Sequence, residues 1–428
     1  RRCCPTGRPP LWGGFARGSS GGGRHCPAVP LPQAIRARTA ATHRVLYIRI
    51  TRSRTKTSGY ATMAFNANLL LVTAFLCLLS VHHGRACFPA IFSFGDSLQD
   101  TGNFINTFAN TTISKHPWGI TYFHKATGRY SDGRLIIDFI AQALGLPLVP
   151  PYRGGGTFSR GANFAFGGAT AQDRKALAGL GLNVTSFMDT SLFVQIGWFK
   201  DLLKSVPSLA DRTFLGNSLF MMGEIGGNDF NAALSQNKPI ENIKNAFVPG
   251  VVRTISSGIT TLIELGAKNF IVPGNLPIGC IPAWLSKYKR SDPGFYDANG
   301  CIKWLNDFSQ YYGSKLQDEL NKLKRAHPEA NIYYADYHGA GMRLFSNPKQ
   351  FGIAERFVAC CGGNGHGCDE TGPVCSNPST FASWEGFHPT EAFYHAVSDE
   401  LISGSFAIPL LKQTCSKHAQ KRAYTLHY

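Results

Sequence analysis

The sequence predicts an α/β fold in which a parallel β-sheet is covered by helices on both faces. Short apolar runs rich in β-branched and aromatic residues recur after residue 90, with stretches of helical spacing between them. Such runs are typical of strands that are buried on both faces, and strands that alternate with helices pair in parallel. No composition break or internal repeat follows residue 90, so we expect one domain over residues 87–428.

Residues 1–62 differ in composition from the rest of the chain. They hold twelve Lys and Arg and no Asp or Glu, whereas the other 366 residues carry 31 basic and 26 acidic side chains. The formal charge of +17 therefore belongs mainly to this leader, which argues against a nucleic-acid or membrane-surface role for the remainder. We expect residues 1–62 to be disordered or foreign to the natural protein, the alternative being a transit peptide.

A secretory signal peptide is predicted at residues 63–86. Met63 precedes an apolar run of thirteen residues, Leu69–Val81, and a small-x-small sequence ends at Ala86. This run has the length of a signal-peptide core and is too short to span a bilayer. We therefore expect cleavage near Ala86, secretion to the extracellular space or cell wall, and no transmembrane segment.

Cysteines and glycosylation sequons agree with export. An even number of cysteines in an exported chain predicts disulfides, and eight follow the leader: Cys87, Cys280, Cys301, Cys360, Cys361, Cys368, Cys375 and Cys415. The simplest pairings are Cys280 with Cys301 and bonds within residues 360–375, where the spacing fits no usual zinc site. Sequons predict N-glycosylation at Asn110 and Asn183.

The strands and helices are marked by their patterns. Five segments are predicted as strands: Ile91–Phe94, Ala162–Phe166, Ser218–Met222, Asn269–Val272 and Asn331–Ala335. Helical spacing covers residues 135–143, 241–265 and 305–323. Ser131 and Asp132 are the expected cap of the first of these helices, while Gly266 and Pro328 end the other two.

A serine and a histidine stand where catalysis would need them. Ser97 follows the first strand on a glycine turn, where a following helix would aim backbone N–H groups at negative charge. Glu385 lies three residues before His388, a spacing that lets the carboxylate reach the imidazole through a tight turn and fix its tautomer. The alternatives are an ordinary strand-end turn and a packed loop histidine.

Two glycine-containing turns add candidate hydrogen-bond donors. Asn228 follows the strand at 218–222, and its amide is suited to an oxyanion; Gly167 and Gly168 follow the strand at 162–166 and offer a backbone N–H. Each motif alone is common in turns. Together with Ser97 and His388, these signals predict one site built from strand ends and a C-terminal turn.

These blocks resemble the GDSL esterase/lipase family within the SGNH hydrolases. The resemblance rests on Gly95–Leu98, the Gly-x-Asn-Asp block at 226–229 and the C-terminal carboxylate-x-x-His; Gly128–Leu135 and Val272–Cys280 resemble the plant secreted branch. It implies a three-layer α/β/α sandwich with a five-stranded parallel, flavodoxin-like sheet. It also implies Ser97 as nucleophile, His388 as base, and an oxyanion hole made by the Ser97 N–H, the Gly167 N–H and the Asn228 side chain.

The resemblance covers residues 87–415 and departs from the family at one position. The family usually has Asp where Glu385 stands, although Glu keeps the charge and both acceptor oxygens. We expect a secreted serine esterase that hydrolyses carboxylic esters of small molecules or polymers through an acyl-enzyme, without metal or organic cofactor. An acyltransferase on the same triad, or an impaired ligand-binding member, is the alternative.

Overall fold

The computed structural model describes residues 87–184, 189–363, 367–404 and 406–408, so the expected leader and signal peptide lie outside the described residues. The main sheet has the strand order β2-β1-β3-β4-β5-β8. Its strands are β1 (Ile91–Ser93), β2 (Gly161–Asn163), β3 (Leu219–Met221), β4 (Asn269–Pro273), β5 (Asn331–Ala335) and β8 (Ala407–Ile408). The first five are parallel, which confirms the five predicted strands, and β8 adds an antiparallel edge. The order 2-1-3-4-5 is the flavodoxin-like one.

Helices connect the strands, and a small second sheet lies near the C-terminus. The α-helices are α2 (Asn103–Thr107), α3 (Ile136–Ala143), α4 (Arg174–Gly179), α5 (Leu192–Ser205), α6 (Arg212–Asn217), α7 (Gly227–Ser235), α8 (Ile240–Asn242), α9 (Val248–Leu265), α10 (Pro282–Lys287), α11 (Lys303–Ala326), α12 (Tyr337–Ser346) and α13 (Glu391–Ile402). The second sheet pairs β6 (Glu355–Ala359) with β7 (Phe381–Ser383) in parallel.

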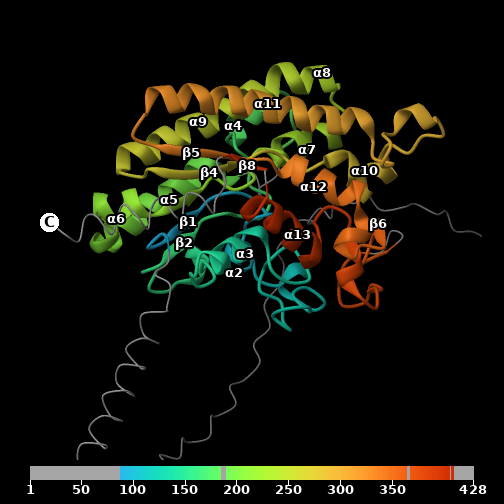
Figure 1. Ribbon diagram of the computed structural model, residues 1–428, viewed down its shortest axis with the longest axis horizontal. Coiled ribbons are helices and arrows are strands. Elements are labelled where there is room, and N and C mark those ends of the chain that lie inside the picture. The colour runs from blue at the N-terminus through green and yellow to red at the C-terminus, as the bar shows by residue number, and fades with distance from the viewer. Residues whose placement is uncertain (1–86, 185–188, 364–366, 405, 409–428) are drawn as a thin grey trace, which may run out of the picture. The chain divides into compact units, whose positions relative to one another are not determined.

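Alternating side chains of the strands fill two separate cores. Phe92, Phe220 and Phe270 belong to one core and their neighbours Ile91, Leu219 and Ile271 to the other, as the two-residue period of a strand requires. The first core contains the apolar faces of α5, α9 and α11, and the second those of α3, α12 and α13. Figure 1 shows α9 and α11 on one side of the strands and α3 on the other. This arrangement confirms the three-layer α/β/α expectation.

The helix predicted at 241–265 forms, with one irregular turn. It comprises α8, a π-helical turn at Ile243–Phe247 and α9, and it ends at Gly266, whose φ of 116° suits glycine. The π turn ends two residues before Pro249, which cannot donate a backbone hydrogen bond. Ile240–Leu265 is long and apolar enough to cross a membrane by length and composition alone, but 61% of its most apolar window is buried inside the fold.

The cap expected for α3 is found elsewhere. Asp138, in the first turn of α3, accepts the Leu135 N–H at 2.9 Å and also forms a buried ion pair with Arg129. Asp132 instead accepts the backbone N–H of Glu391 at 2.7 Å, at the start of α13. The predicted cap thus serves a different helix, because α13 packs beside α3 and presents its unpaired N–H groups there.

We expect Phe199→Ala to lower the free energy of unfolding by about 3–5 kcal/mol. Phe199 is fully buried on α5, and its ring lies 5.1 Å from that of Phe92 and 5.7 Å from that of Phe220. Truncation leaves a cavity over the centre of the sheet. Urea unfolding measures the change, and Lys200→Ala, at the exposed neighbouring position, should change the free energy by less than about 0.5 kcal/mol.

Candidate active site

The turn after β1 presents Ser97 at the carboxyl edge of the sheet. Gly95 begins the turn with φ 145°, and its N–H and C=O both bond the side-chain amide of Gln195 at 2.9 and 2.8 Å. Contrary to expectation, no helix begins at Ser97, and α2 starts only at Asn103. The Asp96 carboxylate accepts the Leu98 N–H at 2.9 Å, as in a helix cap, and the Asp100 N–H donates to the Asp96 carbonyl at 3.0 Å, but only this one turn forms. The Asp100 carboxylate then accepts the N–H groups of Gly102 and Asn103, where α2 begins.

The structure brings Ser97, His388 and Glu385 together. Nε2 of His388 lies 2.7 Å from Oγ of Ser97. Nδ1 of the same ring bonds Oε1 of Glu385, and this oxygen also accepts the His388 backbone N–H at 2.8 Å. A carboxylate on Nδ1 keeps the proton there, so Nε2 is free to accept the hydroxyl proton of Ser97. The Glu385 side chain, which is one methylene longer than Asp, therefore fits at this position, and its carboxylate bonds both the ring and the backbone of His388.

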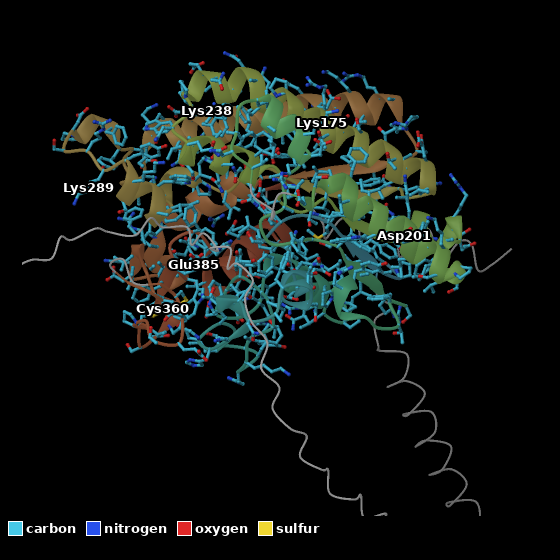
Figure 2. All side chains as sticks on the ribbon, turned by 180° about the vertical axis from the view of Figure 1, so that it is seen from behind. Lys175, Asp201, Lys238, Lys289, Cys360 and Glu385 are labelled. Atoms are coloured by element: carbon cyan, nitrogen blue, oxygen red, sulfur yellow. A yellow bond between two sulfur atoms is a disulfide. The ribbon has the colours of Figure 1, made fainter. Side chains whose placement is uncertain are left out.

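The loop that carries His388 is held by β7 and by disulfides. The Trp384 N–H donates to the His388 carbonyl at 2.8 Å, and the Cys361 N–H donates to the Trp384 carbonyl at 2.7 Å. Cys360 pairs with Cys375 and Cys361 with Cys368, while Cys280 pairs with Cys301 as predicted. Glu385 and Cys360 lie on this part of the fold in Figure 2. Because these thiols are oxidised, they are not zinc ligands.

Tyr130 packs between the histidine and the Gly167 turn. Its ring centroid is 4.8 Å from that of His388 with the planes tilted by 39°. A Cβ placed on Gly167 would lie 2.1 Å from the Tyr130 hydroxyl, so only glycine permits this approach. Burial raises the pKa of Tyr130 well above its usual value, and the nearby Asp100, Glu385 and Asp96 carboxylates add to the effect. The phenol is therefore neutral. The sequence reasoning missed this residue, although it lies inside the Gly128–Leu135 block.

The expected oxyanion donors differ in their present partners. The Ser97 N–H has no hydrogen-bond partner within the described ranges. The side-chain amide of Asn228 donates to Oδ2 of Asp96 at 3.1 Å and to the Ala169 carbonyl at 2.9 Å, so both of its hydrogens are engaged. Asn228 follows β3, the neighbour of β1, which places its amide near the Ser97 turn.

The Gly167 N–H, expected as an oxyanion donor, already has a partner within the protein. This N–H donates to Oδ2 of the buried Asp100 at 2.9 Å. Burial raises the pKa of Asp100 to about 6, opposed by the N–H groups of Gly102, Gly167, Phe104 and Asn103. The next N–H, that of Gly168, has no partner in the part of the chain that is described, and its φ of 80° suits glycine. The candidate donor of this turn is therefore Gly168.

The remaining expected sites lie on the surface or outside this centre. Asn110 and Asn183 are both exposed, as glycosylation requires. A small apolar hollow adjoins the His388 loop, lined by Leu276, Pro277, Cys280, Ile281, Pro282, Phe345, Arg356, Ala382, Ser383, Phe387, His388, Pro389 and Phe393. Ser97 and Asn228 do not line this hollow.

Comparisons with known proteins agree with this geometry. Residues 91–401 match the model of the GDSL-like lipase/acylhydrolase family. The chain is 44% identical to the GDSL esterase/lipase At1g28590 of Arabidopsis thaliana over 362 residues, which cover 79% of this chain and 89% of that protein. It is 42% identical to the Arabidopsis GDSL esterase/lipase At1g31550 over 365 residues, 81% of this chain and 92% of that protein. These matches confirm the family resemblance.

We expect Gly167→Ala to slow the reaction of Ser97 with a fluorophosphonate probe by about 10–100-fold. The new methyl group would occupy the place of the Tyr130 hydroxyl and force the ring away from His388, which displaces the base. Labelling rates of folded protein provide the measurement. Gly179→Ala is the control, because a Cβ on Gly179 meets no atom within 4 Å. An unchanged rate for Gly167→Ala would contradict the role given to this contact.

Proposed function

Because the chain belongs to the GDSL-like lipase/acylhydrolase family, we propose that it is a serine esterase that hydrolyses carboxylic esters. The observation that carries this proposal is the 2.7 Å contact between Ser97 and His388, backed by Glu385 on the other ring nitrogen. The contact lies at the carboxyl ends of β1 and β3, where the strand order reverses and open α/β sheets place their ligands.

The proposed reaction passes through an acyl-enzyme. Oγ of Ser97 attacks the ester carbonyl carbon while its proton passes to Nε2 of His388, and Glu385 stabilises the imidazolium that forms. His388 then gives this proton to the leaving alkoxide as the carbon–oxygen bond breaks. Water attacks the acyl-enzyme with His388 again as base, and the carboxylic acid leaves as the Ser97 hydroxyl is restored.

Three groups are proposed to hold the oxyanion of the tetrahedral intermediates. Two are the Ser97 and Gly168 N–H groups, and support comes from their lack of other partners in the described residues. The third is the Asn228 amide, which must redirect one hydrogen from Asp96 or Ala169 toward the substrate. Gly168 takes the role that the sequence suggested for Gly167.

The intact triad supports an enzyme over a ligand-binding protein. Replacement of the family's usual Asp by Glu385 leaves both bonds of that carboxylate to His388 in place. Acyl transfer to a hydroxyl other than water uses the same residues, and product analysis with an added alcohol separates the two reactions. We also propose a secreted chain with a signal peptide at 63–86 and one domain at 87–428; its disulfides and exposed sequons support export.

Ser97→Ala should lower kcat/KM at least about 10³-fold, because it removes the nucleophile while the fold and the remaining donors persist. The assay uses p-nitrophenyl esters from acetyl to long acyl chains, with protein secreted from a chain that begins at Met63. Ser235→Ala, at the exposed end of α7, is the matched control and should retain wild-type turnover. Equal turnover by Ser97→Ala and wild type would refute the proposed mechanism.

Glu385→Gln should lower kcat about 10²–10⁴-fold, since it removes the charge that stabilises the imidazolium and lets the side chain present an N–H to Nδ1. Glu385→Asp keeps the charge and should retain more activity than the amide. Steady-state kinetics of both variants, with thermal unfolding as the check on folding, give the comparison. Wild-type kcat in a folded Glu385→Gln would show that this carboxylate is not part of the triad.

A further inference from the structure

The buried carboxyl groups of Asp96 and Glu224 lie next to each other, beside the turn that carries Ser97. Asp96 precedes Ser97 and Glu224 follows β3; their residues are 3% and 2% exposed. The two side chains hydrogen-bond to each other, and the Asp96 N–H donates to the Glu224 carbonyl at 3.1 Å. Neither carboxyl forms an ion pair with Lys or Arg among the described residues. Two adjoining buried carboxylates without a cation cannot both be ionised, so the pair holds one proton.

The hydrogen bonds indicate which group carries that proton. Asp96 accepts the Leu98 N–H through Oδ1 and the Asn228 amide through Oδ2. Glu224 accepts, among the N–H groups of the described residues, only that of Gly227, at 3.1 Å. More donors stabilise the anion of Asp96 than that of Glu224. Burial raises the pKa of Asp96 to about 6 and that of Glu224 well above its usual value, which agrees with a neutral Glu224.

We propose that Glu224 is a positioning residue of the esterase reaction: its acid proton is donated to Asp96, whose carboxylate then holds the Asn228 amide in place beside Ser97. The pair thereby ties the turn after β1 to the turn after β3. This proposal rests on the proposed function, in which Asn228 binds the oxyanion. The Asp96 carboxylate holds one amide hydrogen, so the other is the one that turns from the Ala169 carbonyl to the substrate.

The surroundings of the pair leave few other sources of charge. The titratable groups whose fields reach it are His388, Asp229, Tyr130, Tyr312, Tyr337 and Tyr394. Burial raises the pKa of each of these four phenols, so all are neutral. A positive charge on His388 lowers the pKa of Asp96.

The test compares three variants of the whole enzyme. Glu224→Gln can still donate an N–H to Asp96 and accept the Gly227 N–H, so it should keep at least about a third of wild-type kcat. Glu224→Ala removes the donor and should lower kcat about 10-fold with a much smaller change in KM. Asp96→Asn leaves one acceptor oxygen for two donors, the Leu98 N–H and the Asn228 amide, so an N–H must face one of them, and the variant should lower kcat at least as far.

The pattern of the three results decides the proposal. An inactive but folded Glu224→Gln overturns it, and so does an active Asp96→Asn, because either result puts the essential proton elsewhere. Full activity of Glu224→Ala overturns it as well. All rates are compared with the Ser97-dependent rate of the wild type. If the wild type has no such rate, the esterase proposal fails; if it has one and the Glu224 and Asp96 variants do not behave as expected, only the proposal for Glu224 fails.

The pH dependence of kcat is a further test, because it would not change if Glu224 only packed against its neighbours. Without the Glu224 donor the Asp96 anion is less stable and its pKa rises, so the acid limb of kcat in Glu224→Ala should move to higher pH. Glu224→Gln should leave that limb in place, and an unmoved limb in Glu224→Ala contradicts the proposal. If Glu224→Ala does not fold, infrared spectra at pH 8.5 decide: the wild type should show a protonated carboxyl band that Glu224→Gln lacks.

Discussion

Parallel pairing of β1 with β3 is the constraint on which the site depends. The register sets Ser93 opposite Met221, so the two chains leave the sheet at the same level and their next turns must share one space. Glycines at 95 and 223 make this possible: a Cβ at Gly223 would lie 2.0 Å from the Phe94 carbonyl. The nucleophile and Asn228 therefore owe their proximity to the pairing of two three-residue strands, which the two cores hold from opposite faces.

The base reaches this edge by a different route. His388 stands on a loop outside the main sheet, and its position depends on backbone bonds from Trp384 and Cys361, and on contact with Tyr130. The loop is anchored at its far end by α13, whose first N–H groups bond Asp132 and the Thr390 hydroxyl. The Ser97 turn, held by the main sheet, and the His388 loop, held by the bonds just described, thus meet at the 2.7 Å contact between Ser97 and His388.

Local patterns predicted the parts of the fold that local physics determines. The five parallel strands, the long helices and the Glu385-to-His388 turn each depend on residues close in sequence. Such patterns could not predict hydrogen bonds between segments that are far apart in the sequence. The sequence alone does not distinguish Gly167 from Gly168 as a donor. The difference comes from Asp100, 67 residues away, whose carboxylate accepts the Gly167 N–H and not that of Gly168. Likewise, the position of Asp132 predicts a cap for the nearest helix, α3, but its carboxylate accepts the N–H of Glu391 in α13, which is 259 residues away in the sequence.

Ser97 and His388, the proposed nucleophile and base, are 291 residues apart in the chain. During synthesis from the N-terminus, the Ser97 turn is made first, and His388 is added 291 residues later. A nascent or C-terminally truncated chain therefore holds a serine hydroxyl with no base to activate it. Order of synthesis alone therefore delays the proposed esterase chemistry until the His388 loop has been made.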